Sequence, residues 1–263
     1  MNSVLDFGRF KAAGRRISMV TSYDAWSARL IAQSQVDAVL VGDSAAMVMH
    51  GHSTTVAATV RLMVAHTGAV ARGIGGKFLI ADLPFLSYRK GIPSAMAAVG
   101  ALSTSGAQAI KIEGVDGHEA VIRNIVGSGV PVMGHIGLTP QSVNQFGGFR
   151  VQGRGDDDAA LLLRQAHTLE NLGCFSIVIE CVPAPLASRI TTELQIPTIG
   201  IGAGAGTSGQ VLVLQDLWGV DTQHSPRFVR RYIDGNGVLT DALNRFDADV
   251  KDARFPGAEE SYT

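Results

Sequence analysis

Four acidic residues each stand at the end of a short apolar run, and their placement restricts the fold more than any other feature of the chain. The runs cover residues 39–43, 78–82, 109–113 and 176–180, and they end in Asp43, Asp82, Glu113 and Glu180. Apolar runs of this length, bounded by turn residues, are typical of buried parallel strands. A charge inside such a strand is costly, whereas a charge at its carboxyl end can face a pocket. Four such acids therefore predict a site at the carboxyl-terminal rim of a barrel.

Apolar runs alternate with helix-like segments along the chain, which predicts an α/β fold with a parallel sheet. Strands are expected near residues 17–23, 38–43, 78–82, 109–113, 132–136, 176–181, 197–202 and 211–215. Helices are expected near residues 25–34, 59–72, 93–104, 118–128, 157–172 and 185–194. Eight strands in 263 residues favour a closed (β/α)8 TIM barrel, which typically takes about 250 residues. We expect one domain over residues 1–263 with a polar helical tail over about 219–263, and the segment 211–215 is also compatible with a helix.

Composition limits the partners of the protein. Charged residues make up 17% of the chain and mean hydropathy is +0.20, which predicts a large buried fraction and a homo-oligomer. The formal net charge of −1 makes nucleic acid and anionic membranes poor partners. No segment has the pattern of a signal peptide or a membrane span, so we expect a soluble, cytoplasmic protein. Cys174 and Cys181 lack a metal-binding spacing, and we interpret them as reduced thiols.

Three of the acids are candidate metal ligands. Side chains alternate along a strand, so Lys111 and Glu113 point the same way, and Asp43 and Asp82 on the two preceding strands can face the same mouth. Three clustered carboxylates would repel one another. A hard divalent cation relieves the repulsion, and oxygen ligands with room for water favour Mg²⁺. The alternative is that individual acids pair with arginine or cap a helix.

Three further residues are candidates for chemistry. Lys111 could bind a substrate carboxylate, act as a Schiff-base amine, or simply pair with Glu113. Glu180 lies two strands beyond the metal strands, which suits a general base that acts on a metal-held substrate; a rim ion pair is the alternative. His135 lies in an apolar strand, where a histidine is more often a satisfied core residue than a functional one.

Two glycine-rich segments admit more than one interpretation. Residues 139–155 form a long aperiodic connection beside the expected site, which is either a functional loop or an ordered packing loop. Residues 200–209 contain a formal G-x-G-x-x-G pattern, but neither the required helix nor the acid about 20 residues further on is clear. We favour close approach of the backbone to a ligand over dinucleotide binding there.

Seven short sequence blocks are distributed over nearly the whole chain. They are Val-Gly-Asp-Ser at 41–44, Ala-Asp-Leu-Pro at 81–84, Lys-Ile-Glu-Gly at 111–114, Gly-His-Ile-Gly-Leu-Thr-Pro-Gln-Ser at 134–142, Val-Gln-Gly-Arg at 151–154, Ile-Glu-Cys-Val-Pro at 179–183 and Ile-Gly-Ile-Gly-Ala-Gly at 199–204. In these blocks the chain resembles the ketopantoate hydroxymethyltransferase family. The sequence departs from the usual family pattern at Ser53, Ala57 and Glu260.

The resemblance implies a (β/α)8 barrel of the phosphoenolpyruvate mutase and isocitrate lyase superfamily. It also implies an enzyme that transfers a hydroxymethyl group from 5,10-methylenetetrahydrofolate to 3-methyl-2-oxobutanoate, giving 2-dehydropantoate (ketopantoate) on the way to pantothenate. Members of the family often form decamers.

The resemblance assigns a role to each candidate residue. It implies Mg²⁺ at Asp43, Asp82 and Glu113, and Glu180 as the proton acceptor. The implied keto-acid ligands are Asp43, Ser44, Asp82 and Lys111, to which we add His135 as a candidate. The rival activities are a Mg²⁺-dependent lyase or another reaction of a 2-oxo acid, and a protein that only binds the keto acid.

Overall fold

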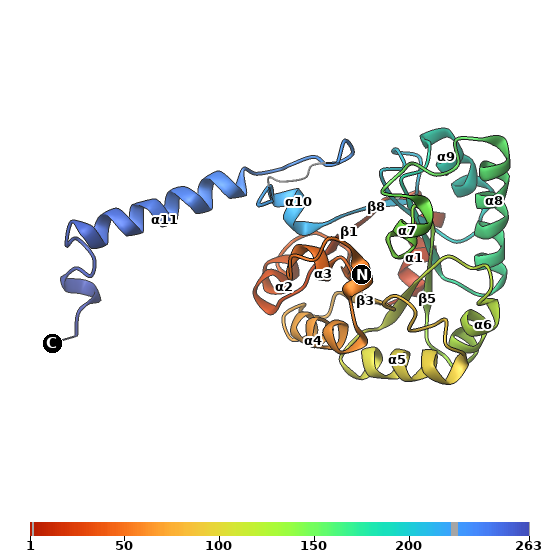
Figure 1. The fold of residues 1–263 in the computed structure, drawn as a ribbon, viewed down its shortest axis with the longest axis horizontal. Helices are drawn as coiled ribbons and strands as arrows, with labels where there is room; N and C mark the ends of the chain where they lie inside the picture. Colours follow the sequence, from red (N-terminus) through yellow and green to blue (C-terminus); the bar gives the residue numbers. More distant parts are fainter. Residues whose placement is uncertain (2, 222–225, 263) are drawn as a thin grey trace. The chain divides into compact units, whose positions relative to one another are not determined.

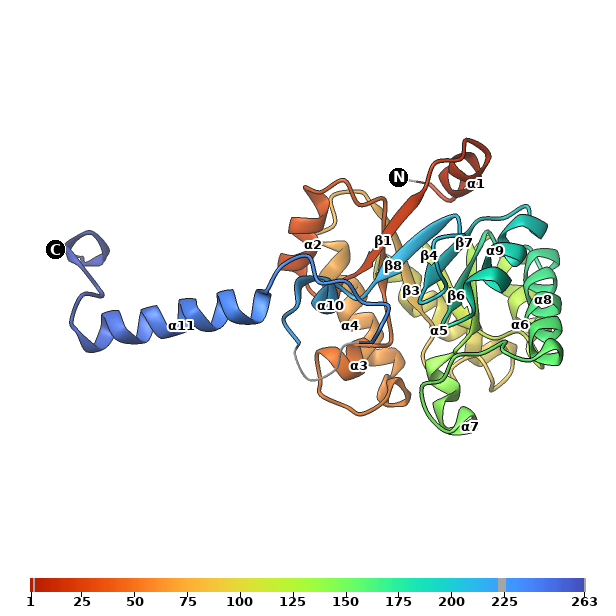
Figure 2. The same ribbon diagram turned by 90° about the horizontal axis from the view of Figure 1, so that it is seen from above.

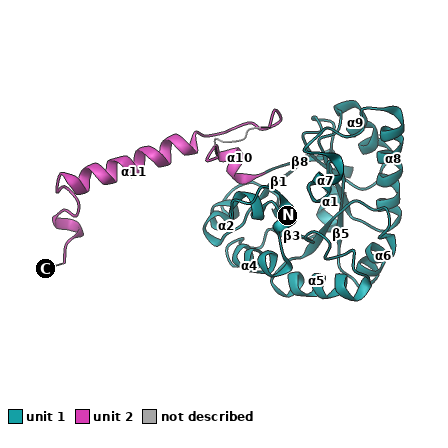
Figure 3. Ribbon diagram, viewed as in Figure 1, with its two compact units in different colours: residues 1–212 teal, residues 213–263 magenta. Residues whose placement is uncertain are grey.

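A computed structural model describes residues 1, 3–221 and 226–262 of the chain. The chain divides into two compact units, residues 1–212 and residues 213–263 (Figure 3). No helix in the described residues is both long and apolar enough to cross a membrane.

The first unit is a closed barrel of parallel strands in the order β1 to β8, which confirms the predicted (β/α)8 architecture (Figure 1). Each strand pairs with its neighbours in sequence, and β8 closes the ring on β1. The strands are β1 (Ile17–Thr21), β2 (Ala38–Val41), β3 (Phe78–Asp82), β4 (Ala109–Glu113), β5 (Val132–Gly137), β6 (Ser176–Glu180), β7 (Thr198–Ile201) and β8 (Gly209–Leu212).

The outer helices occupy the six segments that the apolar periodicity predicted, with ends that differ by one or two residues. They are α2 (Ala25–Ala32), α4 (Val60–Ala71), α5 (Ile92–Thr104), α6 (Glu119–Gly127), α8 (Asp156–Asn171) and α9 (Ala184–Glu193). Short elements lie in the loops after β2 and β5: α3 (Ala45–Val48), η1 (Thr55–Ala57), η2 (Pro140–Ser142) and α7 (Val143–Phe146). Figure 2 shows α3 and α7 at the same end of the barrel, where the strands finish.

The eighth strand is shifted from its predicted position at 211–215. It covers Gly209–Leu212, and α10 (Leu214–Trp218) begins directly afterwards. Gly209 explains the earlier start, because a Cβ there would meet the backbone oxygen of Ile17 on β1 at 2.4 Å. Only glycine permits this close pairing, and an apolar periodicity cannot reveal it because glycine carries no side chain.

The N-terminal helix α1 (Leu5–Ala12) closes the opposite end of the barrel from α3 and α7 (Figure 2). Its Phe7 is fully buried in the barrel core and packs edge-on against Phe78 and Phe175, with ring centroids 5.6 and 5.0 Å apart. Edge-to-face packing adds about 1 kcal/mol per pair to the apolar burial. The plugged end leaves the carboxyl-terminal rim as the open one.

The second unit contains α10, the long helix α11 (Gly235–Lys251) and the short η3 (Ala258–Glu260). Glu260 accepts a hydrogen bond from the backbone N–H of Gly257 and so caps η3. One face of α11 is apolar and remains exposed within the described residues; it comprises Leu239, Leu243, Phe246 and Val250.

Candidate active site

Strand register brings the predicted site residues to one rim. Asp82 pairs with Lys111 across β3 and β4, and Glu113 pairs with His135 across β4 and β5. Gly137 at the end of β5 pairs with Glu180 at the end of β6. Because all these strands run parallel, their carboxyl ends share an edge, as the spacing of the acids predicted.

Asp43, Asp82 and Glu113 form a buried acidic cluster around Lys111. Each of these four residues is 5% exposed or less. Lys111 Nζ lies 2.9 Å from Asp82 Oδ1 and 3.9 Å from Glu113 Oε1. The backbone N–H of Asp43 donates to Asp82 Oδ2 at 3.0 Å, which ties the segment after β2 to the end of β3.

This cluster carries more negative than positive charge. Burial raises the pKa of Asp43 well above its usual value, and repulsion from Glu113 and Asp82 adds to the shift. Burial also raises the pKa of Asp82, although Lys111 opposes it. Burial lowers the pKa of Lys111, but the attraction of the three carboxylates outweighs burial and raises it. Lys111 is therefore an ammonium, and the cluster would be stabilised by a further cation.

His135 connects this cluster to Glu180. The ring is 1% exposed, with Nδ1 3.4 Å from Glu113 Oε1 and Nε2 3.3 Å from Glu180 Oε2. Neither contact has good hydrogen-bond geometry, so the attraction is chiefly electrostatic. Burial and the charge of Lys111 lower the pKa of His135, but the two carboxylates outweigh them and raise it to about 9. His135 is thus not an isolated core histidine.

The backbone is unusual directly after Glu180 and on the neighbouring strand β5. Gly137 has φ +91°, and a Cβ there would lie 2.2 Å from the backbone oxygen of Glu180. That oxygen accepts a hydrogen bond from Leu138 N at 2.8 Å. Cys181, directly after Glu180, has φ +48°, which is strained for a residue with a side chain. The rim is therefore shaped to hold Glu180 in one place.

Ser44 lies beside the acidic cluster at the start of α3. Its Oγ is 2.8 Å from the hydroxyl oxygen of Tyr23, a side chain that is 1% exposed. The carbonyl of Tyr23 in turn accepts from His66 Nδ1 at 2.6 Å, which fixes the tautomer of His66. Burial raises the pKa of Tyr23, so its hydroxyl remains a proton donor.

Gln141 is a site residue that the sequence reasoning missed. It lies in η2, inside the aperiodic segment 139–155, and is 4% exposed. Its side-chain Nε2 donates to Asp43 Oδ2 at 2.8 Å, and its backbone N–H donates to Glu113 Oε2 at 3.0 Å. The signal that could have found it is its place in the 134–142 block, immediately after the strand that carries His135.

The donor set fits a hydrated Mg²⁺ ion. Asp82 Oδ1 and Glu113 Oε1 are buried oxygens that accept no hydrogen bond of good geometry from the described residues. Carboxylates are the oxygen ligands that Mg²⁺ prefers, and Mg²⁺ keeps several of its waters. In the described part of the chain, no three His, Cys, Asp or Glu side chains are already arranged to hold one ion.

Comparison with known proteins identifies the family. A model of the family described as ketopantoate hydroxymethyltransferase matches residues 2–258. The chain is 52% identical over 263 residues to 3-methyl-2-oxobutanoate hydroxymethyltransferase of Bdellovibrio bacteriovorus, covering 100% of both chains. It is 51% identical over 262 residues to the enzyme of the same name from Francisella tularensis, covering 100% of this chain and 99% of the relative.

The chain belongs to the ketopantoate hydroxymethyltransferase family. This confirms the resemblance drawn from the seven sequence blocks. Solved structures support the fold at much lower identity. Phosphonopyruvate hydrolase, in a complex with oxalate and Mg²⁺, matches with a TM-score of 0.67 and 12% identity, over 99% of this chain and 93% of the other. A 2,3-dimethylmalate lyase of the phosphoenolpyruvate mutase and isocitrate lyase superfamily matches with a TM-score of 0.62 and 16% identity, over 100% and 92%.

Two glycines of the 200–209 segment, Gly204 and Gly206, pack directly against helix α9. A Cβ at Gly204 would lie 2.4 Å from Ala184 Cβ, and one at Gly206 would lie 2.7 Å from Ser188 Cβ. Both neighbours belong to α9, so the glycines allow the loop after β7 to lie directly on that helix.

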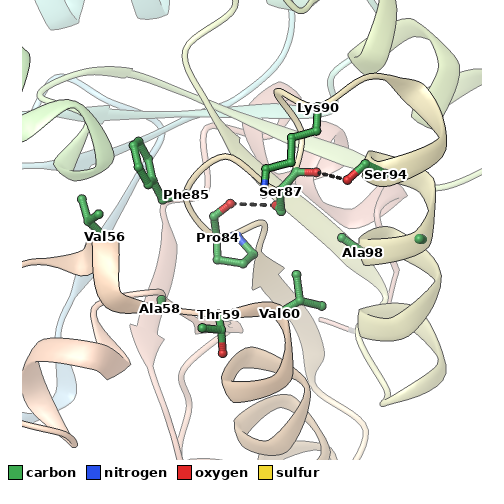
Figure 4. Close-up of a pocket in the computed structure, with 11 residues that line it drawn as sticks. Val56, Ala58, Thr59, Val60, Pro84, Phe85, Ser87, Lys90, Ser94 and Ala98 are labelled. Carbon is green, nitrogen blue, oxygen red and sulfur yellow. Dashed lines mark hydrogen bonds between the residues drawn. The ribbon is translucent and has the colours of Figure 1, made fainter.

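A separate pocket of about 500 Å³ lies beside the loop that follows β3 (Figure 4). The acidic cluster takes no part in its wall. Within it, Ser87 Oγ donates to the carbonyl of Pro84 at 2.7 Å and Ser94 Oγ donates to the carbonyl of Ser87 at 3.4 Å. The pocket is lined by Val56, Ala58, Thr59, Val60, Pro84, Phe85, Ser87, Lys90, Ser94, Ala97 and Ala98. Two of the family departures, Ser53 and Ala57, lie in the segment that leads to this wall.

Proposed function

We propose that the protein transfers a hydroxymethyl group to 3-methyl-2-oxobutanoate and forms 2-dehydropantoate. The carbon comes from 5,10-methylenetetrahydrofolate, a water is consumed, and tetrahydrofolate is released. Family membership over the whole chain supports the substrate class. The observation that carries the chemistry is the continuous buried chain of charges from Asp82 and Lys111 through Glu113 and His135 to Glu180.

Mg²⁺ would be held by Asp43, Asp82 and Glu113. Asp43 is repelled by Glu113 and Asp82, and this repulsion among buried carboxylates supports the assignment. When bound, the ion supplies a Lewis acid that polarises the keto group of the substrate. The structurally similar phosphonopyruvate hydrolase was solved as a complex with oxalate and Mg²⁺, which is a property of that protein and is compatible with this proposal.

Lys111 and Ser44 would bind the charged end of the keto acid. The ammonium of Lys111 is held charged by Asp82 and Glu113, so it offers a positive charge to a substrate carboxylate. A charged amine is a poor nucleophile, which favours this role over a Schiff base. The Ser44 hydroxyl, which is hydrogen-bonded to Tyr23, adds a polar contact next to Asp43.

Glu180 would remove the β-proton of the substrate. It is less buried than the metal-binding acids, with its side chain 17% exposed, so it can meet a ligand at the rim. His135 lies against Glu180 Oε2 and also against Glu113, so it orients the base relative to the acidic cluster and could contact the substrate itself. The enolate formed by this proton transfer then attacks the one-carbon donor.

The protein would act as a cytoplasmic homo-oligomer, with a decamer as the family precedent. The exposed apolar face of α11 supports assembly, because side chains such as Leu243 (69% exposed) are costly to leave in water. The low fraction of charged residues in the chain, 17%, also supports assembly.

The direct test is product formation. The protein is incubated with 3-methyl-2-oxobutanoate, Mg²⁺ and 5,10-methylenetetrahydrofolate, and 2-dehydropantoate is sought by mass spectrometry. We expect the product to form with stoichiometric release of tetrahydrofolate. Cleavage of a 2-oxo acid without consumption of the folate would instead identify a lyase. Saturable keto-acid binding with neither product would identify a binding protein.

A further inference from the structure

Gln141 lies where the loops after β2, β3 and β5 meet. Its Nε2 donates to Asp43 Oδ2 at 2.8 Å and to the carbonyl of Leu83 at 2.9 Å. Its backbone N–H donates to Glu113 Oε2 at 3.0 Å. One residue that carries no charge therefore contacts two of the three acids that we assign to the metal.

We propose that Gln141 is a positioning residue that presents Asp43 and Glu113 to the divalent cation. This inference rests on the metal site proposed above. Each contact occupies one oxygen of a carboxylate and so restricts the rotation of that side chain. Hydrogen bonds that orient metal ligands in this way typically change metal affinity by about 10–100-fold when they are removed.

The orientation of the Gln141 amide follows from its partners. A carboxylate oxygen and a backbone carbonyl accept hydrogen bonds and donate none, so the amide nitrogen must face Asp43 and Leu83. The opposite end, Oε1, lies 2.9 Å from the hydroxyl of Tyr88, which donates to it. A flipped amide would place an oxygen against two acceptors, and that arrangement is strongly disfavoured.

Tyr88 adds further hydrogen bonds to Gln141 and to the backbone of Glu113. Its side chain is 3% exposed, and its hydroxyl lies 2.9 Å from Gln141 Oε1 and 3.1 Å from the backbone oxygen of Glu113. Burial raises the pKa of Tyr88, so the hydroxyl stays a donor. One proton is shared between the two acceptors, so the Tyr88 contact should contribute less than the direct contacts of Gln141.

The test compares Gln141→Met with a matched surface variant, Gln165→Met. Methionine preserves the length and flexibility of glutamine but has no amide donor. Gln165 also donates to a carboxylate, Asp116 Oδ2 at 2.6 Å, but this contact is exposed and Asp116 is not one of the three acids assigned to the metal. Binding of Mn²⁺, used as the probe for Mg²⁺, is measured by electron paramagnetic resonance of the free ion. Thermal unfolding in EDTA is recorded for each variant.

We expect Gln141→Met to raise the Mn²⁺ Kd about 10–100-fold, and Gln165→Met to leave it within twofold of wild type. Tyr88→Phe should raise the Kd less, by about threefold to tenfold, and it serves as the second variant if Gln141→Met does not fold. Excess metal should restore much of the lost turnover in both site variants. A residue that only stabilises the loop would instead lower the unfolding temperature without moving the Kd.

The outcomes separate this inference from the proposed function. Tight Mn²⁺ binding by wild type and unchanged binding by Gln141→Met and Tyr88→Phe would overturn the role of Gln141 and leave the metal site intact. Absence of Mn²⁺ binding by wild type would overturn the metal site, and the inference with it.

Discussion

Replacement of Lys111 by methionine tests the electrostatic balance of the rim. The variant keeps the apolar stem of the side chain and removes the ammonium that offsets part of the negative charge of three buried carboxylates. Lys111 is 5% exposed, and its Nζ lies 2.9 Å from Asp82 Oδ1 and 3.9 Å from Glu113 Oε1. The loss therefore occurs where water cannot compensate fully.

The magnitude follows from these distances. With an effective dielectric constant near 20, the two attractions amount to roughly 6 and roughly 4 kcal/mol. Burial of the ammonium cancels several kcal/mol of this gain, and removal of one partner from a buried pair typically costs about 3–5 kcal/mol. The raised pKa of Lys111 means that this contribution is fully present below its unfolded value of 10.5 and is lost only as pH rises through the folded value.

The assay is urea unfolding at pH 7.5, in EDTA and in excess Mg²⁺. We expect Lys111→Met to lose about 3–5 kcal/mol of unfolding free energy in EDTA, and Mg²⁺ to recover part of that loss because a cation again neutralises the acids. Lys251→Met removes an exposed ion pair with Asp247 and should cost less than about 1 kcal/mol. Two results would refute the reasoning. One is a Lys111→Met protein that is as stable as wild type in EDTA. The other is a Lys111→Met protein whose gain in unfolding free energy on addition of Mg²⁺ is no larger than the gain of wild type.

Other regions give independent predictions. Gly137→Ala should lower turnover at least tenfold while the protein still binds Mn²⁺, because the added Cβ would lie 2.2 Å from the backbone oxygen of Glu180. Turnover is measured by steady-state kinetics, and a wild-type turnover number for this variant would contradict the prediction. Burial and Arg89 lower the pKa of His118 to about 4, so the free energy of unfolding should fall as pH drops from about 6.5 towards 4. Urea unfolding of His118→Gln should show a difference in unfolding free energy between pH 7 and pH 5 that is about 2 kcal/mol smaller than that of wild type. Light scattering should give a mass well above 27.6 kDa, and Leu243→Lys on α11 should reduce it; a wild-type monomer at micromolar concentration would be inconsistent with assembly.

The fold was predictable because burial imposes a simple pattern on parallel strands. Strand β3 is an apolar run that ends in Asp82, and β4 is an apolar run that is interrupted by Lys111 and ends in Glu113. The bounds of both strands agree with the prediction at both ends. The exception, β8, begins at Gly209, where the requirement is close approach to β1 and no apolar side chain marks it. The burial of Phe7 at the amino-terminal end of the barrel was equally unpredictable, because one aromatic residue in a short helix makes no periodic pattern.

The candidate site was predictable only where charge stands out against an apolar background. Asp82 and Glu113 are conspicuous at strand ends, and the structure brings them to one cluster. Gln141 was missed because a neutral amide in an aperiodic loop has no such contrast, and its role depends on tertiary contacts with Asp43 and Leu83. The two contacts of His135 likewise depend on the register of three strands.

Exchange of the substrate β-proton in D₂O tests the central claim most directly. The claim is that Glu180 accepts this proton at the rim, and the measurement needs Mg²⁺ and 3-methyl-2-oxobutanoate but no folate. Glutamine at position 180 keeps the shape and hydrogen bonding of the side chain but cannot accept the proton, and loss of a general base typically costs about 10²–10⁴ in rate. We predict that wild type catalyses the exchange, observed by proton NMR, and that Glu180→Gln binds Mn²⁺ and the keto acid normally yet exchanges at least 100-fold more slowly. Exchange by Glu180→Gln at the wild-type rate would mean that another group, such as His135, is the base.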